Sequence, residues 1–464
     1  MIFSSTLFLF IFLPVVLLAY YAIPMRYIAV KNGWLFLASL VFYAWGEPKN
    51  IVLMLLAIVC NYVFAIGIEK CRSYGDVRAC RAILALSLLY NLGALFFFKY
   101  FNFATGGAFP HIALPIGISF FTFQIMSYTI DVYRGEVAAQ RDILKLGLYI
   151  SLFPQLIAGP IVRYVDIEKQ LSERSYDADK LFSGTSRFII GLSKKVLISN
   201  TVAVMADFAF GVGSGLNAAT AWLGAICYAL QIYYDFSGYS DMAIGLGQLL
   251  GFDFLENFNY PYVSCSVQEF WRRWHISLSS WFRDYLYIPL GGNRRGKLKT
   301  YVNLTIVFAC TGIWHGAAWS FLVWGLYHGF FLIVERVGFR NVLERLPKPV
   351  SRAYTLLVVL FGWVLFRADT LAGALRYMAA MLDFSNIGLV RASLQLDNIT
   401  GFAILLGIVF SAPVLPWAKR KLESLPGGKT SSYLLNVAGC IGLFLLSVVF
   451  LTGSDYNPFI YFRF

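Results

Sequence analysis

Charged residues are scarce in this chain of 464 residues, and that scarcity is the first constraint on its fold. They make up 14% of the sequence, whereas about 25% is usual for a soluble domain. Hydrophobic residues reach 59% and aromatic residues 17%. A water-soluble fold cannot hide that much apolar surface, and disordered chains are poor in these same residues. The composition therefore excludes a soluble globular enzyme and a disordered protein.

Cross-linking and cofactor motifs are also missing. The seven cysteines form no CxxC pair and lie mostly in apolar stretches, so we expect neither a disulfide framework nor a metal site. We find no Gly-x-Ser-x-Gly elbow, Walker loop or metal motif in a suitable context. No internal repeat, low-complexity tract or flexible linker divides the chain, which predicts a single membrane-embedded domain over residues 1–464.

What the sequence does contain is a series of long uncharged runs. About 20 apolar residues cross a hydrocarbon core of about 30 Å, so the runs predict an all-α, polytopic membrane protein with about ten to twelve membrane segments. The first run is longer than a signal-peptide core and lacks a basic region before it, so we expect it to remain as a membrane helix. The long runs are Ile2–Met25, Asn50–Ile68, Ala82–Phe98, Tyr100–Ile130, Leu146–Val162, Phe208–Tyr234, Thr300–Val334, Asn398–Ala418 and Thr430–Ser454, and the shorter candidates are Asn32–Gly46, Phe188–Ala206 and Ala353–Phe366.

The basic residues concentrate in loops between these runs. They follow the first and third membrane segments and fill the segments Gln268–Thr300, Val334–Arg352 and Lys419–Lys429. Cytoplasmic loops carry an excess of Lys and Arg, so these loops are predicted in the cytoplasm and both termini outside. Topology thus explains the net charge of +13, and no nucleic-acid partner is expected.

One uncharged run has basic segments at both ends. Thr300–Val334 must therefore enter the membrane and return, yet its 35 residues give only roughly 52 Å of helix at ~1.5 Å per residue. We expect a short hairpin or broken helix pair whose middle, Thr311–Gly316, lies deep in the membrane. Irregular backbone at that depth is tolerated only when protein encloses it or when it lines a cavity. The segment is therefore a predicted functional site.

His315 lies at the centre of that predicted turn. An ionisable residue inside a membrane segment is a functional candidate by default, and a neutral imidazole can take a proton from a hydroxyl and return it. Its position alone is equally compatible with a hydrogen-bonded packing histidine. Of the other histidines, His328 is expected to be a packing residue and His111 an exposed loop residue.

His275 lies in a predicted amphipathic helix. Phe270, Trp274, Leu278, Trp281 and Tyr285 recur at helical spacing, with arginines on the other faces, which is typical of a helix at the cytoplasmic interface. His275 lies beside this stripe, and a structural and a functional role are both open. The following glycine-rich loop carries Arg294, Arg295 and Lys297, which suit phosphate groups, although the positive-inside bias predicts the same residues.

Two carboxylates, Asp235 and Asp241, flank the sequence Phe236-Ser-Gly-Tyr-Ser, next to an apolar run. Carboxylates so close to apolar runs usually pair with a nearby base or cap a helix end. We therefore expect a structural role for both.

Several motifs together resemble the membrane-bound O-acyltransferase family, specifically its bacterial, alginate O-acetylase-like branch. The most specific are the Trp274-His275-Ile-Ser motif, which continues to Pro289-Leu-Gly-Gly, and the later Gly312-Ile-Trp-His315-Gly-Ala-Ala-Trp motif. The start of the chain, the segment Tyr233–Asp241 and the end from Asn457 to Phe462 resemble the same branch. The resemblance thus covers nearly the whole chain.

The resemblance implies a bowl of membrane helices around a central tunnel, with re-entrant or broken helices, in a bacterial inner membrane. His315 matches the essential histidine of the family's Trp-His-Gly motif, and His275 matches its second histidine. The implied reaction moves an acetyl group from a cytoplasmic thioester, acetyl-CoA or another acyl thioester, towards an exopolysaccharide such as an alginate-like or cellulose-like polymer. No permanently bound cofactor is implied. The implied partners are the lipid bilayer and a periplasmic acetyltransferase or polymer synthase complex.

Other functions stay open from the sequence. Within the family, the alternatives are peptidoglycan O-acetylation and D-alanyl transfer to a cell-wall polymer. Outside it, a transporter or export channel also uses broken helices with polar residues at mid-membrane. The sequence does not distinguish completing the transfer from handing the acyl group to a partner.

Overall fold

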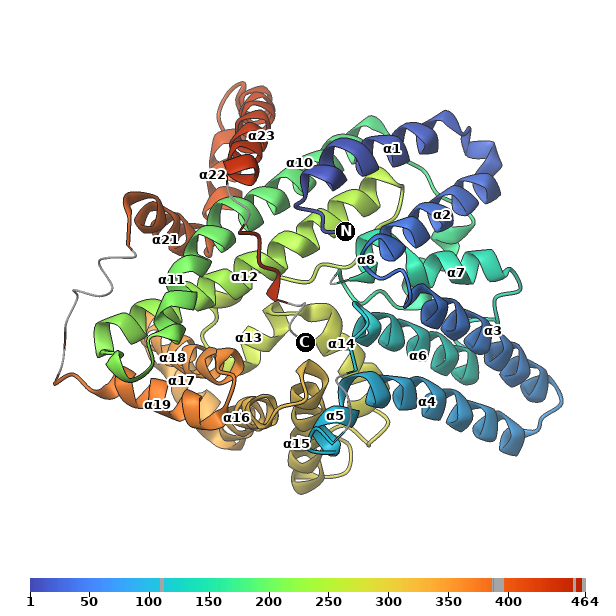
Figure 1. Cartoon of the computed structure of the whole chain (residues 1–464), viewed down its shortest axis with the longest axis horizontal. Coiled ribbons are helices and arrows are strands. Elements are labelled where there is room, and N and C mark those ends of the chain that lie inside the picture. Colours follow the sequence, from blue (N-terminus) through green and yellow to red (C-terminus); the bar gives the residue numbers. More distant parts are fainter. Residues whose placement is uncertain (109–111, 158, 386, 388–395, 454–455, 461–464) are drawn as a thin grey trace. The chain divides into compact units, whose positions relative to one another are not determined.

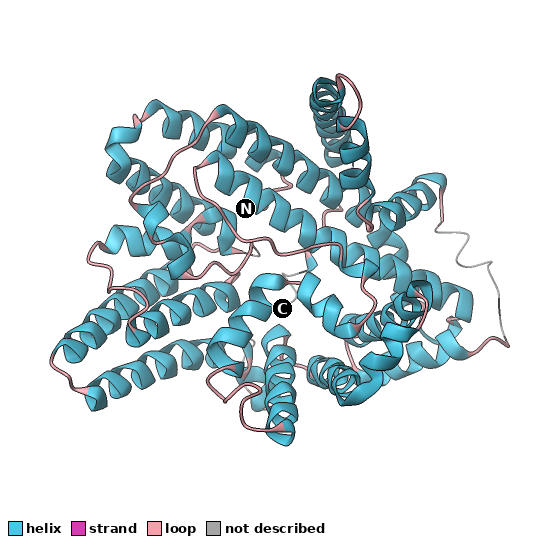
Figure 2. Cartoon of the chain, turned by 180° about the vertical axis from the view of Figure 1, so that it is seen from behind, coloured by secondary structure: helices cyan, strands magenta, loops and turns pink. Residues whose placement is uncertain are grey.

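The computed structural model describes residues 1–108, 112–157, 159–385, 387, 396–453 and 456–460. Over these residues the chain forms helices joined by loops, and no strand occurs among them (Figure 2). The all-α prediction is therefore confirmed. The chain divides into two compact units, one of residues 1–188 and 240–256 and the other of residues 189–239 and 257–464. Two helices, α10 (Ala178–Ser193) and α12 (Ala218–Leu249), contribute residues to both units.

The first unit is built mainly from the N-terminal helices (Figure 1). Within it, α3 and α4 lie side by side, and the buried amides of Asn61 and Asn91 donate hydrogen bonds to each other at 3.1 and 2.8 Å. Paired amides satisfy polar groups inside an apolar pair of helices. Besides the first part of α10, its helices are α1 (Leu13–Ala22), α2 (Ile28–Gly46), α3 (Ile51–Ser73), α4 (Val77–Lys99), α5 (Phe101–Ala104), α6 (Ile118–Arg134), α7 (Ile143–Ser151), α8 (Phe153–Leu156) and α9 (Tyr164–Ile167).

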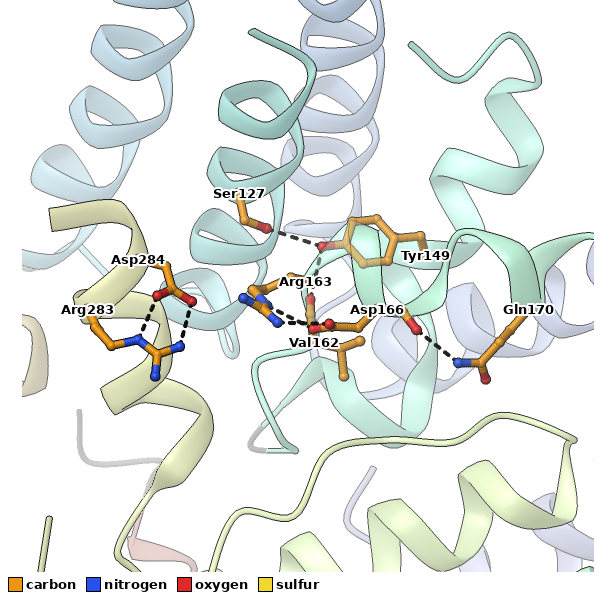
Figure 3. A network of polar contacts seen from close by, with 8 residues as sticks. All are labelled: Ser127, Tyr149, Val162, Arg163, Asp166, Gln170, Arg283 and Asp284. Carbon is orange, nitrogen blue, oxygen red and sulfur yellow. Dashed lines mark hydrogen bonds and ion pairs between the residues drawn. The ribbon is translucent and has the colours of Figure 1, made fainter. Parts of the chain in front are cut away.

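A polar network fixes the loop that follows α8. The Tyr149 hydroxyl lies 2.9 Å from the carbonyl oxygen of Val162, to which it donates a hydrogen bond, and Arg163 forms an ion pair with Asp166 at 2.9 Å (Figure 3). In the second unit, Arg283 and Asp284 form an ion pair at 2.7 Å between neighbouring residues (Figure 3).

The second unit holds both candidate histidines. Besides parts of α10 and α12, its helices are α11 (Asn200–Gly211), α13 (Val267–Arg273), α14 (Ile276–Phe282), α15 (Lys297–His315), α16 (Trp319–Val334), α17 (Arg340–Arg345), α18 (Lys348–Arg367), α19 (Leu371–Leu382), α21 (Asn398–Phe410), α22 (Val414–Glu423) and α23 (Gly428–Gly453) (Figure 1). Short π-helical stretches include η4 (Lys194–Ser199) after α10 and η7 (Arg283–Tyr287) after α14.

The membrane character of the fold is also confirmed. Among the described residues, seven helices are long and apolar enough to cross a membrane, or up to eight when the pair α21 and α22, bent by 64°, is one span. Two shorter apolar helices, Phe8–Ala22 and Leu371–Leu382, add to these. The number of full-length spans is below the ten to twelve segments expected, because some uncharged runs fold into shorter helices, such as the 17 residues of α6.

The predicted hairpin over Thr300–Val334 is present as α15 and α16, joined by residues 316–318. The two helices touch through glycine: a Cβ on Gly325 would lie 2.2 Å from the Phe308 carbonyl oxygen, and one on Gly312 would lie 2.4 Å from that of Phe321. Small residues allow such close backbone approach between membrane helices. The hairpin prediction is therefore confirmed.

The depth of the turn in the membrane stays a prediction, but its position relative to α18 is shown. The His315 ring contacts the ring of Phe366, which precedes the last residue of α18, with centroids 5.0 Å apart. The turn is therefore level with the end of a candidate spanning helix, and not halfway along it. The reason is that α15 begins at Lys297, ahead of the uncharged run, and its 19 residues extend over roughly 28 Å.

The predicted amphipathic helix around His275 is not continuous. Trp274 is extended and His275 has a positive φ of 44°, so the segment breaks into α13 and α14. Four residues of the apolar stripe are buried inside the protein: Phe270, Trp274, Leu278 and Trp281. The stripe therefore packs against protein, because the break turns the two short helices inward.

Candidate active site

His315 is the last residue of α15, and aromatic rings surround it. Its ring centroid lies 4.9 Å from that of Trp314, 5.0 Å from that of Trp324 on α16 and 5.0 Å from that of Phe366 on α18. The side chain is 5% exposed. The helix ends here because the next residue, Gly316, adopts an extended conformation. Three helices therefore hold one imidazole in a largely apolar enclosure.

A pocket of about 190 Å³ adjoins this enclosure. Ala318 lines it from the turn that follows His315 and Phe321 from the first turn of α16, and Phe366 and Arg367 line it from the end of α18. The remaining wall comes from α11, α12, Ser320 on α16, residues 368–369 after α18 and residues 458–460. Charged and aromatic side chains meet in this pocket. His315 itself is not one of its lining residues, but Phe366, whose ring contacts the His315 ring, is.

His275 occupies the break between α13 and α14 and is 1% exposed. It is one of two non-glycine residues with positive φ in the described part of the chain. Histidine adopts this conformation more readily than most residues, and such strain persists only where the surroundings enforce it. Burial lowers the pKa of His275 to about 3, so its imidazole is neutral at physiological pH.

Asn257 enforces the break. Its side-chain oxygen lies 3.1 Å from His275 Nδ1, and it accepts hydrogen bonds from the backbone N–H and the hydroxyl of Ser277 at 3.2 and 2.9 Å. Its own carbonyl accepts the Ile276 N–H at 3.0 Å. Sequence reasoning missed Asn257, because its separation of 18 residues from His275 matches neither a helical nor a strand period.

The two candidate histidines are brought close together. Trp314 contacts both, with ring centroids 6.2 Å from His275 and 4.9 Å from His315. His275 also meets the ring of Phe236 on α12 at 4.6 Å. The two motifs, distant in sequence, therefore build one aromatic site.

The basic loop lies elsewhere. Arg294, Arg295 and Lys297 are exposed and precede or begin α15. Because His315 ends the same helix, roughly 28 Å of helix separates Lys297 from it. Gly291, Gly292 and Gly296 have positive φ there, a conformation that glycine adopts without steric cost. The loop is therefore open to an anion but is not part of the histidine enclosure.

The remaining sequence candidates are structural. Asp235 pairs with Lys195 at 2.6 Å and Asp241 pairs with Arg187 at 2.9 Å, which confirms the predicted pairing of both carboxylates. His328 is fully buried, with its ring centroid 5.2 Å from that of Trp271 and 5.3 Å from that of Trp324, as expected for a packing residue. His111 lies outside the described residues. No group of three His, Cys, Asp or Glu side chains able to hold a metal occurs in the described part.

Comparison with known proteins places this site in a family context. Residues 77–375, which contain both histidines, match the membrane-bound O-acyltransferase family. The chain is 40% identical to a probable alginate O-acetylase of Pseudomonas putida over the full length of both proteins. It is 33% identical to a peptidoglycan O-acetyltransferase of Helicobacter pylori over 100% of this chain and 98% of that protein. A teichoic acid D-alanyltransferase of Bacillus subtilis is 30% identical over 55% of this chain and 68% of its own length.

Proposed function

The chain belongs to the membrane-bound O-acyltransferase family, and we propose that this multi-pass acyltransferase moves an acetyl group from a cytoplasmic thioester towards a hydroxyl of an exopolysaccharide. The observation that carries the proposal is His315 itself, which ends a helix inside an aromatic enclosure, follows the motif tryptophan and adjoins a pocket. Residues 1–464 act as one membrane-embedded domain in this proposal.

His315 serves as the general base. Its imidazole takes the proton of the acceptor hydroxyl as that oxygen attacks the thioester carbonyl carbon. The carbon–sulfur bond then breaks, and the thiol leaves with the proton that the imidazole returns. Positioned proton transfer of this kind contributes about 10²–10⁴-fold in rate. The rings of Trp314, Trp324 and Phe366 keep bulk water away, which limits hydrolysis of the thioester.

His275 supports this reaction from the neighbouring break. Burial keeps its imidazole neutral. Its ring contacts Trp314, which also contacts His315, and it orients the aromatic enclosure from the cytoplasmic side. It is a positioning residue in the proposal, because the shared contact with His315 runs through Trp314.

Arg294, Arg295 and Lys297 contact phosphate groups of the donor. Guanidinium and ammonium groups suit phosphate, and the loop is exposed. A donor that touches both this loop and His315 must span roughly 28 Å of helix. Coenzyme A carries its phosphates at the far end of an extended arm from its sulfur, so acetyl-CoA fits this requirement better than a compact acetyl donor.

The loop then faces the cytoplasm, and both termini lie outside in the inner membrane of a bacterium. The acceptor is an alginate-like or cellulose-like polymer, reached with a periplasmic acetyltransferase or a polymer synthase complex as partner. Full-length identity of 40% to a probable alginate O-acetylase supports a polysaccharide more strongly than the lower identity to the peptidoglycan and teichoic acid enzymes.

The test is to quantify ester-linked acetate on the secreted polymer of a strain whose only copy carries His315→Ala. We expect acetate to fall to the level of the deletion strain while membrane abundance stays normal. Gly439→Ala is the matched control, because a Cβ at Gly439 meets nothing within 4 Å. Normal acetylation of the polymer with His315→Ala would refute the role of His315 as general base. Acetate found on peptidoglycan alone would show that the acceptor is the cell wall and not an exopolysaccharide.

A further inference from the structure

The last described residues of the chain, 456–460, form a segment that we term the C-terminal strap. Four polar contacts fasten it within the second unit. The Tyr456 hydroxyl donates to Asp207, and the Asn200 amide donates to Asn457 at 3.1 Å. Lys195 donates to the Pro458 carbonyl, and the Ile460 N–H donates to Asp235 at 2.8 Å. The segment, irregular over residues 456–459, is thus tied at four of its five residues.

Two of these contacts come from a buried ion pair. Lys195 and Asp235 lie 2.6 Å apart with side chains 2% and 1% exposed. They meet because their helices approach closely: a Cβ on Gly238 would lie 2.7 Å from the Gly191 carbonyl oxygen. Removing two charges from water costs about as much as their attraction returns, so a buried pair adds little stability by itself. What this pair does add is one defined position for the strap backbone.

The strap forms a wall of the pocket beside His315. Pro458, Phe459 and Ile460 line that pocket together with Arg367 and Asp207. Asp207 connects the strap to α18, because it accepts a hydrogen bond from Tyr456 of the strap and forms an ion pair with Arg367 at 2.6 Å. The shape of the pocket therefore depends on where the strap is fastened.

Gln231 on α12 lines the same pocket and is 4% exposed. Its side-chain oxygen has no hydrogen-bond partner among the described residues. Because Gln231 borders the pocket, a donor held there would complete the hydrogen bonding of this oxygen. A hydroxyl group is a donor of the right kind.

We propose that this pocket binds a single hydroxyl-bearing sugar residue of the acceptor, with Gln231 accepting from one of its hydroxyls and Phe366, whose ring also contacts His315, forming part of the wall. In this proposal, which rests on the proposed function, Lys195 and Asp235 are positioning residues that act through the strap. The volume of about 190 Å³ is below the ~300–1,000 Å³ of sites for drug-sized ligands. It therefore suits one sugar residue and not a longer stretch of polymer. Aromatic rings beside an amide and an ion pair match the apolar ring faces and polar edges of a sugar.

The experiment uses the purified full chain in lipid nanodiscs, with acetyl-CoA as donor probe and cello-oligosaccharide or mannuronate oligosaccharide as acceptor probes. Initial rates against each substrate give separate values of KM and kcat. Gln231→Leu removes the amide at similar volume, and Lys195→Met combined with Asp235→Leu removes the ion pair without leaving a lone buried charge. Tyr456→Phe loosens the strap at an exposed position and serves if the double variant does not fold.

We expect Gln231→Leu and the double variant to raise the acceptor KM about 10-fold, the equivalent of one lost hydrogen bond, with a much smaller change in the donor KM. Tyr456→Phe raises the acceptor KM less. Gln248→Leu is the matched control, because Gln248 lies on the same helix and its side-chain oxygen also lacks a partner among the described residues, yet it does not line the pocket.

An acceptor KM within twofold of the parent in both Gln231→Leu and a strap variant overturns the inference. If His315→Ala nevertheless abolishes transfer, the proposed function stands without it. If the parent protein transfers acetyl to neither probe and cleaves no thioester, the proposed function fails, and the inference fails with it. An equal rise in donor and acceptor KM indicates general damage and likewise counts against a positioning role.

Discussion

Two interruptions of helical structure carry the two motif histidines, and they are built in different ways. The break at His275 depends on a polar side chain, Asn257, which ties three groups and holds a strained residue. The turn after His315 depends on glycine contacts between helices and on aromatic rings. Only the second interruption contributes residues to the pocket of the candidate site.

This difference separates two roles. A group that exchanges protons with a substrate must meet that substrate, and the pocket wall begins three residues after His315. His275 is enclosed and faces Asn257 and the rings of Phe236 and Trp314. We therefore expect the turn after His315 to carry out the proton transfer and the break at His275 to keep the site in its geometry. Four sets of substitutions sharpen or break this comparison.

The largest effect on activity is expected when each of the two histidines is replaced separately. In the purified protein, His315→Ala should lower kcat/KM for acyl transfer by about 10²–10⁴-fold, the usual contribution of a general base. His275→Asn should lower it less than about tenfold, because asparagine also tolerates a positive φ. Steady-state rates with acetyl-CoA measure both. Equal losses from the two variants would abolish the proposed division of roles.

The next effect concerns the polar break. Asn257→Leu leaves the Ser277 N–H and hydroxyl without their partner in a buried site, which should cost about 3 kcal/mol of folding free energy at ~1–3 kcal/mol per group. Thermal unfolding in detergent reports the loss. Asn257→Asp is the control, because it keeps an accepting oxygen. A melting temperature unchanged in Asn257→Leu would show that the break does not depend on this side chain.

A smaller effect is expected where the hairpin helices touch. Gly325→Ala places a methyl group 2.2 Å from the Phe308 carbonyl oxygen, so α15 and α16 must separate, at a cost of about 2 kcal/mol by analogy with overpacked cores. Activity should fall with stability, because His315 ends α15. Gly439→Ala, with open space around the added methyl, should leave both unaffected. Thermal unfolding and transfer rate are measured together.

The smallest effect is expected from the exposed basic loop. Replacing Arg294, Arg295 and Lys297 by glutamine should raise the donor KM about fivefold, as expected for exposed charge-assisted contacts to phosphate. The acceptor KM should not change. The same replacement of Lys419, Arg420 and Lys421 on α22 is the control for net charge. An equal rise in donor KM from both triple variants would point to general attraction of an anion and not to a site.

The membrane character and the hairpin could both be predicted because each has a local signal, whereas the role of His315 stays a prediction. Uncharged runs have bilayer length, and a run too short for two crossings must turn back. The break at Trp274–His275 could not be predicted in this way, because the apolar stripe through Phe270, Trp274 and Leu278 has an unbroken helical period. Its cause, Asn257, acts from another segment.

The sequence by itself determined that this chain lies in a membrane, that His315 lies at a turn between two helices, and that Asp235 and Asp241 have a structural role. Those results follow from composition, run length and the cost of burying charge, all of which are local. Only the tertiary structure decided that Trp314 joins the two histidines and that α18 ends beside His315. It alone also decided that residues 458–460 line the pocket. These contacts join segments far apart in sequence, and no period or spacing specifies which distant side chains meet.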